Sequence, residues 1–307
     1  MILFASCRPL ERAENIKALW EAYDGEKDFI QMDGKRNNDE LAGDYDLLVT
    51  DEFVTKSSGK CIMLGHGIAG GKTYGLDQPD PYHNMNDAKL LTWVVTSSRY
   101  VLGMVAKQCG VTIDRVLPLG VPRTDAYFGA EKRETDKRIY LYAPTFRKFY
   151  EGEDPILTTD FKKLDELLTD DEVFIVKAHM MMDDPEMEYK HIVVAPKDIP
   201  SKDYLINCDV LVTDYSSIMF DAYVLDKPVV LFAKDKDDYL WNRGMYFRYP
   251  SAYGRFCNNE EDLVRTLREA EKPTDAERLT KALTCEMCDG RSTERVLGLI
   301  KSMEGNK

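Results

Sequence analysis

The segment that decides the fold reads Asp209-Val-Leu-Val-Thr-Asp-Tyr-Ser-Ser-Ile-Met-Phe-Asp-Ala-Tyr-Val-Leu-Asp-Lys-Pro-Val-Val-Leu-Phe232. An apolar run, a tight turn, a helix-like stretch, a second turn and another apolar run follow one another. Within the helix-like stretch, Ile218, Ala222 and Leu225 recur at helical spacing and share one face. Short apolar strands joined through a helix indicate a parallel pair that is covered on both faces. The segment therefore predicts a β–α–β unit of an α/β protein.

The same alternation of strand-like and helix-like patterns extends along almost the whole chain. Strands are expected at Met1–Ser6, Asp28–Met32, Leu47–Thr50, Cys61–Leu64, Trp93–Thr96, Val116–Leu119, Ile139–Tyr142, Val173–Lys177, Ile192–Val194, Val210–Thr213 and Val229–Phe232. Helices are expected between them, at Arg12–Tyr23, Tyr100–Cys109, Phe161–Leu168 and Glu261–Ala270. We therefore predict an α/β fold of two Rossmann-like lobes with a cleft between them and C-terminal helices.

A charged break at residues 130–137 divides this pattern into halves of similar size, and only helical periodicity follows Lys272. We therefore predict one domain over residues 1–130, a second over residues 131–272, and a helical segment over residues 273–307.

Composition limits the classes of function. The net charge of −13 excludes a nonspecific nucleic-acid binder, which needs a basic surface. The longest apolar stretch, residues 90–106, contains the polar run Thr96–Arg99 and is too polar to span a bilayer. The seven cysteines are an odd number and scattered, as is typical of reduced thiols in a cytosol. These features predict a cytoplasmic protein without a transmembrane segment.

An anion site is expected where the first strand of the quoted segment ends. Ser216 and Ser217 fall at the start of the helix, where free backbone N–H groups and the positive end of the dipole favour an anion. Alternatively, Ser216 only caps the helix. The adjacent serines, followed by Asp221, favour the anion site.

A second strand, Val173–Lys177, is followed closely by His179. Residues two apart in a strand point to the same side, so we expect Lys177 and His179 to face one way, as suits a diphosphate. A purely structural histidine is the alternative.

A third signal is the glycine-rich loop after the strand at Cys61, with His66 at its start. Its glycines let backbone approach a ligand, and a histidine can act as a base near neutral pH. Gly71-Lys72-Thr73 suggests an ATP-binding P-loop, but His66 stands where that motif requires glycine. A flexible turn with a surface histidine is the alternative.

Arg123 and Arg147 lie in proline-containing turns that follow strands, where arginine can clamp a phosphate. Arg123 could instead pair with Asp125 or hold the hinge between the domains.

Taken together, these segments resemble the CDP-glycerol glycerophosphotransferase family of teichoic-acid primases and polymerases. The matches, from about residue 60 onward, are His66-Gly67, Gly120-x-Pro122-Arg123-x-Asp125, Pro144-Thr145-x-Arg147, Lys177-x-His179, Asp209 to Phe232, Arg243-Gly244-x-x-Phe247 and Asp289-Gly290-Arg291-x-x-x-Arg295.

The resemblance implies a GT-B type fold, with the acceptor on the N-terminal domain and the CDP donor on the second. It implies that His66 acts on the acceptor hydroxyl and that His179 steadies the donor diphosphate. The implied donor-binding residues are Arg147, Lys177, Asp214, Ser216, Ser217, Asp221 and Arg243. Further candidates are Gly67, Lys72, Arg123, Asp125 and Arg291. No metal or cofactor is expected.

The implied function is transfer of glycerol phosphate, or a related polyol phosphate, from a CDP-linked donor to a hydroxyl acceptor in wall or capsule polymer synthesis. The expected partner is a lipid-linked or saccharide acceptor, with peripheral contact at the inner face of the plasma membrane. One departure is that the family's His-Gly-Thr-Pro loop is replaced here by His66-Gly-Ile-Ala-Gly-Gly-Lys72. The alternatives are therefore a GT-B sugar-nucleotide glycosyltransferase and a noncatalytic nucleotide-binding member.

Overall fold

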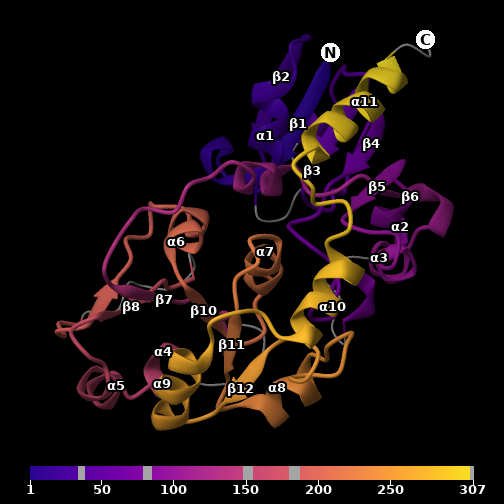
Figure 1. Ribbon diagram of the computed structural model, residues 1–307. Coiled ribbons are helices and arrows are strands. Elements are labelled where there is room, and N and C mark those ends of the chain that lie inside the picture. Colours follow the sequence, from indigo (N-terminus) through magenta and orange to yellow (C-terminus); the bar gives the residue numbers. More distant parts are fainter. Residues whose placement is uncertain (34–38, 79–84, 148–154, 180–186, 305–307) are drawn as a thin grey trace. The chain divides into compact units, whose positions relative to one another are not determined.

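The computed structural model describes residues 1–33, 39–78, 85–147, 155–179 and 187–304. The chain forms two compact units (Figure 1). Unit 1 holds Met1–Phe128 and Leu283–Lys307, and unit 2 holds Gly129–Ala282. Each unit contains a six-stranded sheet. All hydrogen-bonded strand pairs in the described residues are parallel, so the prediction of two parallel sheets with helices is confirmed.

Unit 1 is built from short strands and mostly short helices. Its strands are β1 (Ile2–Ser6), β2 (Lys27–Gln31), β3 (Leu47–Thr50), β4 (Lys60–Met63), β5 (Trp93–Thr96) and β6 (Val116–Pro118). Its helices are α1 (Glu14–Ala22), α2 (Met85–Ala88), α3 (Leu102–Cys109) and α11 (Ser292–Glu304), with 3-10 turns η1 (Leu10–Arg12), η2 (Asp39–Ala42), η3 (Gly75–Asp77), η4 (Ile113–Arg115) and η5 (Pro122–Tyr127).

The core of unit 1 lies on both faces of its sheet because side chains alternate along each strand. In β1, Ile2 and Phe4 join the cluster formed with α1 and α11, whereas Leu3 and Ala5 join the cluster formed with α3. Figure 1 shows α11 lying beside α1. A strand buried on both faces reads as a continuous apolar run, which explains why these strands were recognisable from the sequence.

Unit 2 follows the same plan. Its strands are β7 (Arg138–Tyr142), β8 (Glu172–Val176), β9 (Ile192–Val194), β10 (Val210–Thr213), β11 (Val229–Phe232) and β12 (Arg255–Cys257). Its helices are α4 (Pro155–Thr158), α5 (Phe161–Leu167), α6 (Ser201–Asn207), α7 (Ile218–Val224), α8 (Lys236–Asn242), α9 (Glu260–Glu269) and α10 (Asp275–Thr284). The edge strand β12 was not predicted, because three residues with a polar first member give no apolar run.

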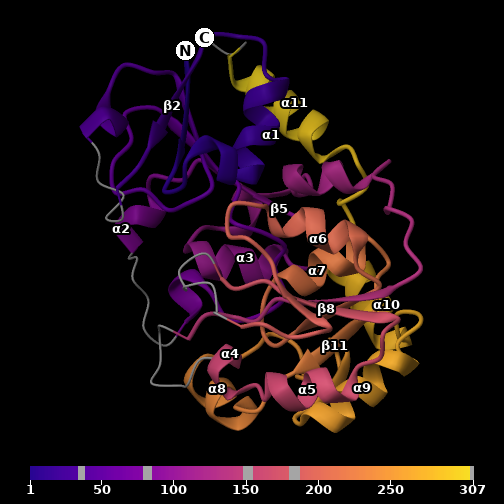
Figure 2. The same ribbon diagram turned by 90° about the vertical axis from the view of Figure 1, so that its left-hand side faces the viewer.

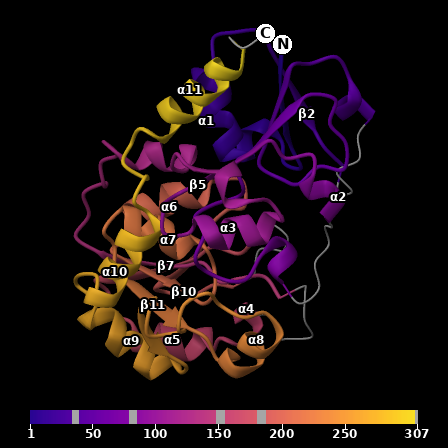
Figure 3. The same ribbon diagram turned by 90° about the vertical axis from the view of Figure 1, so that its right-hand side faces the viewer.

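The helices of unit 2 cover its sheet on both faces. Helices α5 and α9 pack side by side over one face, with Leu164 and Leu263 in the same buried cluster as Val212 (Figure 2). Helices α6 and α7 lie over the other face (Figure 3). Among the described helices, none combines the length and the apolar character that a membrane crossing requires.

Both sheets reverse their strand order once. Unit 1 has the order β2-β1-β3-β4-β5-β6, so the chain leaves β1 to one side for β2 and to the other for β3. Unit 2 has the order β12-β11-β10-β7-β8-β9, so the reversal lies between β7 and β10. In open α/β sheets, ligands bind beyond the carboxyl ends of the two strands that flank such a reversal. The topology therefore singles out the residues after β1 and β3 in unit 1 and after β7 and β10 in unit 2.

The segment predicted as C-terminal helices, residues 273–307, is divided between the units. Helix α10 is tied to unit 2 through Glu277, whose buried carboxylate accepts hydrogen bonds from the N–H groups of Val229 and Thr274, both at 2.6 Å. Helix α11 packs on the sheet of unit 1 through Val296 and Ile300. Unit 1 is therefore closed by a helix from the far end of the chain, a long-range contact that periodicity alone does not reveal.

Two kinds of contact hold the start of α11 in place: hydrogen bonds to Asp125 and a close backbone approach at Gly120. The Asp125 carboxylate accepts hydrogen bonds from the first N–H groups of α11, at Ser292 (3.0 Å) and Thr293 (2.7 Å). An acidic group there also favours the helix dipole. Nearby Gly120 has a φ of +96°, and a Cβ atom on it would lie 2.3 Å from the carbonyl oxygen of Met287. Only glycine fits this position without displacing backbone.

Replacing Gly120 by alanine is expected to lower the free energy of unfolding by about 2–4 kcal/mol, because the backbone strain and the overlap with Met287 add. The matched control is Gly103→Ala in α3, where an added Cβ meets nothing within 4 Å and φ is ordinary. That variant should gain about 0.5–1 kcal/mol from helix propensity. Urea unfolding measures both changes. Equal effects of the two substitutions would contradict the proposed contact.

Candidate functional site

In unit 2, the strand reversal places two serine hydroxyls at the start of α7. Ser216 is half-buried and Ser217 is exposed. Ser217 is the N-cap residue, yet its side chain makes no capping hydrogen bond, and the Ser216 hydroxyl makes no hydrogen bond to another residue in the described part of the chain. The capping alternative for Ser216 is therefore not what the structure shows. Both hydroxyls remain able to bind an added group.

The other side of the reversal is formed by the residues after β7. Thr145 donates its backbone N–H to the Asp214 carboxylate at 2.8 Å, which fastens this turn to the end of β10. The Thr145 hydroxyl oxygen is buried and, within the described residues, has no hydrogen-bond partner. A buried hydroxyl without a partner is costly, and such groups in native proteins call for an explanation such as a bound group or water.

Arg147 lies inside unit 2 rather than at its surface, with its side chain 4% exposed. Its guanidinium donates to Asp214 Oδ2 at 2.6 Å, to Asp235 Oδ2 at 2.8 Å and to the carbonyl oxygen of Thr145 at 2.6 Å. Burial alone would lower the pKa of Arg147, but the two carboxylates outweigh it and raise the pKa. The arginine is therefore always charged, and its charge is compensated within the protein.

Two tyrosines complete this group, which we call the Arg147 cluster (Arg147, Asp214, Tyr215, Asp235 and Tyr239). The rings of Tyr215 and Tyr239 are stacked with centroids 3.6 Å apart, and the guanidinium lies 5.1 Å from each centroid. The Tyr215 hydroxyl donates to Asp235 at 3.0 Å, and burial raises the pKa of Tyr215. Because Tyr239 lies on α8 and Tyr215 directly precedes Ser216, the cluster ties α8 to the serine-bearing turn.

The remaining acidic and basic candidates of unit 2 occupy different positions. Asp221 is buried on α7, and Arg243 directly follows α8 and is half-buried. Lys177 is buried and donates to the carbonyl oxygen of Pro196 at 2.6 Å. His179 is exposed, and its ring stacks on Phe146 with centroids 5.5 Å apart. Strand β8 ends at Val176, so Lys177 and His179 lie beyond it. Lys177 contacts the segment after β9, and His179 contacts the segment after β7.

Along the sheet of unit 2, the order β10-β7-β8 places the serines, Thr145 and His179 after three neighbouring strands. Parallel strands end at the same edge, so these polar groups share one edge of the sheet. This arrangement offers hydroxyl and imidazole groups to a phosphate. The Arg147 cluster, whose buried positive charge is balanced by carboxylates, supports the turn that carries the serines.

In unit 1, the polar groups gather after β1, β3 and β4. The Leu64 N–H donates to the Thr50 carbonyl oxygen at 2.7 Å, which continues the β3–β4 pairing to the very end of β3. Two residues after Thr50 and two residues after Leu64, the side chains of Glu52 and His66 meet, with Glu52 Oε1 and His66 Nε2 2.6 Å apart. The His66 side chain is 27% exposed and that of Glu52 is 8% exposed. The carboxylate is thus almost inside the protein, and the imidazole is at its surface.

A second carboxylate lies behind this pair. Asp51 is buried and accepts a hydrogen bond from the Ser6 hydroxyl at 3.1 Å, across the strand reversal between β1 and β3. Burial raises the pKa of Asp51, and the nearby His66 opposes this rise. The strand reversal of unit 1 therefore carries two buried carboxylates and one histidine.

The glycine-rich loop is held by its backbone. Gly65 has a φ of +66°, which favours glycine, and its carbonyl oxygen accepts a hydrogen bond from the Asn15 side chain at 3.0 Å. The same Asn15 side chain accepts from the Arg123 N–H at 3.0 Å, so α1 joins the loop to the turn after β6. Gly67 and Lys72 are half-buried in the loop.

Two candidates of unit 1 have structural partners. Asp125 binds the start of α11, as described above. The exposed Arg291 guanidinium donates to both carboxylate oxygens of Glu294 at 2.9 Å, within the first turn of α11. The motifs at residues 120–125 and 289–295 are thus brought together around α11.

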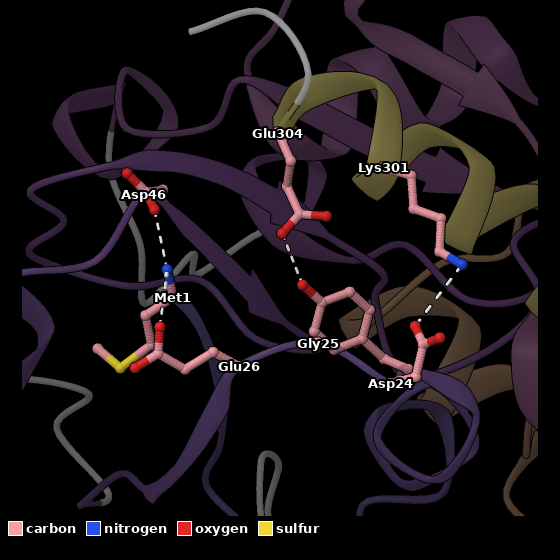
Figure 4. A pocket seen from close by; sticks show the side chains of 8 residues that line it. Met1, Asp24, Gly25, Glu26, Asp46, Lys301 and Glu304 are labelled. Carbon is pink, nitrogen blue, oxygen red and sulfur yellow. Dashed lines mark hydrogen bonds and ion pairs between the residues drawn. The ribbon is translucent and has the colours of Figure 1, made fainter.

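A surface pocket of about 440 Å³ in unit 1 is a separate feature (Figure 4). It is lined by Met1, Tyr23, Asp24, Gly25, Glu26, Asp46, Lys301 and Glu304. Residues 1, 26 and 46 directly precede β1, β2 and β3, so the pocket lies at the amino ends of the strands. That edge is opposite to the one where ligands bind in such sheets. No group of three or more His, Cys, Asp or Glu side chains in the described residues could hold a metal ion.

Sequence reasoning missed four polar groups that the fold brings to the candidate sites: Glu52, Asp51, Asn15 and Asp235. Asp51-Glu52 directly follows a predicted strand, so position after a strand could have indicated both. Asp235 and Asn15 reach their partners from other elements of the chain, and no local pattern signals such contacts.

Comparison with known proteins relates these features to one family. The sequence model of the family described as CDP-Glycerol:Poly(glycerophosphate) glycerophosphotransferase matches residues 11–302. A teichoic acid poly(ribitol-phosphate) polymerase of Bacillus spizizenii is 29% identical over 268 residues, covering 78% of this chain and 42% of that protein. A teichoic acid glycerol-phosphate primase of Bacillus subtilis is 26% identical over 286 residues, covering 87% of this chain and 74% of that protein. The chain therefore spans less than half of the first relative.

Solved structures show the same fold. The wall teichoic acid polymerase TagF matches with a TM-score of 0.77 at 19% identity, covering 99% of this chain and 89% of that chain. A putative UDP-N-acetylglucosamine 2-epimerase from Listeria monocytogenes matches with a TM-score of 0.61 at 12% identity, covering 100% and 97%. These likenesses concern the fold, and they confirm the predicted GT-B type class. Because the family's sequence model matches nearly the whole chain, the chain belongs to the CDP-glycerol:poly(glycerophosphate) glycerophosphotransferase family.

Proposed function

We propose that this chain transfers glycerol phosphate, or a related polyol phosphate, from a CDP-linked donor to a hydroxyl acceptor during synthesis of a teichoic-acid-like wall polymer. The observation that carries the proposal is the match of the family's sequence model to residues 11–302. The named relatives are a primase and a polymerase of teichoic acids, which act on glycerol phosphate and ribitol phosphate. The acceptor is a lipid-linked or saccharide hydroxyl, reached by peripheral contact at the inner face of the plasma membrane.

The donor diphosphate binds in unit 2, at the strand reversal between β7 and β10. Ser216 and Ser217 supply hydroxyl donors, and Thr145 adds a third from the opposite side of the reversal. The hydroxyls of these residues have no hydrogen-bond partner within the described chain, which supports this role. His179 steadies the diphosphate, with Lys177 and Arg243 adding positive charge nearby. Local donors are needed because the chain as a whole has a net charge of −13.

Arg147 acts by holding the serine-bearing turn in shape. Its guanidinium donates to both Asp214 and Asp235, so its positive charge is already balanced by two carboxylates before any phosphate binds. Because Asp214 also accepts the N–H groups of Thr145 and Tyr215, at 2.8 and 2.6 Å, the ion pair fixes both sides of the strand reversal. Asp214 contributes in the same way, from inside the protein.

On the acceptor side, His66 removes the hydroxyl proton. The freed oxygen attacks the β-phosphorus of the donor and forms a new P–O bond. The bond from that phosphorus to its bridging oxygen breaks, and CMP leaves with the electron pair. Donors fixed in the folded protein stabilise the negative charge on the phosphoryl oxygens without reorganising during the step. The replaced residues of the loop, Ile68 to Gly71, lie next to His66 and would alter the choice of acceptor.

The first test is a ligand panel read by thermal unfolding. CDP-glycerol or CDP-ribitol should raise the melting temperature, since a ligand that binds only the folded state stabilises it, whereas UDP-sugars should not. Ser216→Ala and Ser217→Ala should each weaken donor binding about 10- to 150-fold, because a hydrogen bond to a charged group is worth about 1.5–3 kcal/mol. Ser201→Ala, at the start of α6 in the same unit, is the matched control. A response to UDP-sugars alone would favour a glycosyltransferase or an epimerase.

The second test is turnover by a His66→Ala variant. CMP release from CDP-glycerol with a lipid-linked acceptor should fall by about 10²–10⁴-fold, the usual contribution of a general base. Donor affinity should remain within twofold of the unmodified protein, since the donor residues lie in unit 2. Normal turnover by the variant would refute the assignment of the base. Binding of CDP donors without any turnover by the unmodified protein would indicate a noncatalytic member.

The third test separates a structural Arg147 from a phosphate-binding one. Without any ligand, Arg147→Ala should lower the free energy of unfolding by about 3–5 kcal/mol, because the buried Asp214 carboxylate and the half-buried Asp235 carboxylate lose their partner. The control is Arg291→Ala, whose exposed pair with Glu294 should leave stability unchanged within error. If Arg147 served only the ligand, its loss would weaken donor binding and leave the unliganded protein as stable as before. Urea unfolding distinguishes the two results.

A further inference from the structure

The contact between Glu52 and His66 is the feature of unit 1 that bears most directly on the chemistry of the histidine. Glu52 lies two residues beyond the end of β3, and His66 lies three beyond the end of β4. Their side chains meet at 2.6 Å between Glu52 Oε1 and His66 Nε2. This distance is that of a strong, charge-assisted hydrogen bond. His66 is therefore held by a residue that follows a neighbouring strand, whereas a histidine in a flexible turn, the alternative that the sequence left open, would lack such a contact.

The backbone of Glu52 is locked by the last residue of β3. The Thr50 hydroxyl accepts a hydrogen bond from the Glu52 N–H and donates one to the Glu52 carbonyl oxygen, both at 3.1 Å. These two bonds close a tight turn, and the side chain that leaves it is 8% exposed. A carboxylate anchored in this way can hold a partner in one orientation, whereas an exposed, mobile carboxylate would not.

The imidazole is held from a second side as well. Its ring meets the edge of Tyr74, with centroids 6.3 Å apart and planes at 77°. The preceding residue, Gly65, is fastened through its carbonyl oxygen to Asn15 at 3.0 Å. The ring is thus fixed by a carboxylate, an aromatic neighbour and a bound backbone.

The two ring nitrogens of His66 have different surroundings. Nε2 faces the Glu52 carboxylate, which can only accept a hydrogen bond. Nδ1 is buried and makes no hydrogen bond to any residue in the described part of the chain. A neutral imidazole carries one N–H group, and the nitrogen that bonds a carboxylate keeps it. The lone pair therefore resides on Nδ1, which is left without a hydrogen-bond donor among the described residues and can accept a proton from a group that binds there.

The other nearby carboxylate, Asp51, has a different hydrogen-bond partner. Asp51 accepts a hydrogen bond from Ser6, and burial raises its pKa, which favours its protonated form relative to an exposed aspartate. Arg8 also lies close enough to act on the charge of Asp51. Glu52 is the carboxylate in direct contact with the ring.

We propose that Glu52 is the positioning residue of His66, holding the proton on Nε2 so that Nδ1 is the atom that accepts the acceptor's proton. The proposal rests on the proposed function and adds a residue and an atom to it. In the step, the hydroxyl proton moves to Nδ1 while the hydroxyl oxygen bonds to the β-phosphorus and CMP departs with the electron pair. The imidazolium that forms carries its charge beside the Glu52 carboxylate, which stabilises it. The imidazolium then returns its extra proton to water.

The direct test is the tautomer of His66 in the unmodified protein. The chain has four histidines, so nitrogen-15 NMR of the histidine-labelled protein gives a spectrum in which the signals lost in a His66→Asn variant identify His66. At a pH where the ring is neutral, we expect Nε2 to carry the proton and Nδ1 to show the shift of a bare nitrogen. A protonated Nδ1 with a bare Nε2 would overturn the proposal. This measurement needs no substrate, so it stands even if the proposed function fails.

Two substitutions of Glu52 test its effect on the reaction. Glu52→Gln keeps an oxygen that can accept the Nε2 proton but removes the charge, whereas Glu52→Ala removes both. We expect the tautomer to persist in the glutamine variant and to be lost in the alanine variant. The kcat for CMP release should fall about 100-fold in the alanine variant, because misplacing a catalytic group typically lowers the rate by about that factor. The fall should be smaller in the glutamine variant. The KM for the CDP donor should stay within twofold.

Glu304→Gln is the matched control, since this carboxylate accepts a hydrogen bond from the Tyr23 hydroxyl at 2.6 Å at the opposite edge of the same sheet. It should leave both kcat and the His66 signals unchanged. A kcat within threefold of the unmodified protein in Glu52→Ala would overturn the proposal. If the alanine variant does not fold, the glutamine variant and the unmodified protein still decide the question through the tautomer. Absence of turnover in every variant, including the unmodified protein, would instead count against the proposed function.

Discussion

Parallel pairing of the strands is the constraint on which the other features of this chain depend. The ten strand pairs of the described residues all run in the same direction, so in each sheet the carboxyl ends meet at one edge. One reversal of strand order per sheet then opens that edge between two neighbouring strands. The polar groups discussed above follow those strands. The same constraint explains why the surface pocket of Figure 4, at the amino ends, is unrelated to them.

Charge in this protein is arranged locally. The chain carries 54 acidic and 41 basic side chains, so an anionic ligand is opposed by the overall field. In unit 2, the buried Arg147 is shared by two carboxylates, and the hydroxyls of Thr145, Ser216 and Ser217 have no hydrogen-bond partner among the described residues. Burying a charged group is expensive unless it is paired and hydrogen-bonded, and the Arg147 cluster meets both conditions. The cluster stabilises the local backbone conformation, since it fixes Thr145 and Tyr215 around the place where the chain leaves β10.

In unit 1 the same principle takes a different form. Glu52 and Asp51 bring negative charge below the surface, next to a histidine that a flexible loop alone would not hold. The hydroxyl of Thr50, the side chain of Asn15 and the ring of Tyr74 come from three separate parts of the chain. Together they make the histidine part of the folded unit, although it belongs to a loop with several glycines.

The sequence by itself determined the fold class, every strand except β12 and the family, because continuous apolar runs and the order of motifs can be read directly along the chain. Ser216, Ser217 and His66 were also recognisable, since each follows a predicted strand. The tertiary structure alone decided the partners. It placed Asp235 against Arg147, Glu52 against His66 and Asp125 at the start of α11, and it divided the C-terminal helices between the two units. These contacts join residues up to about 170 positions apart, and a hydrogen bond depends on distance in space, which periodicity along the chain does not encode.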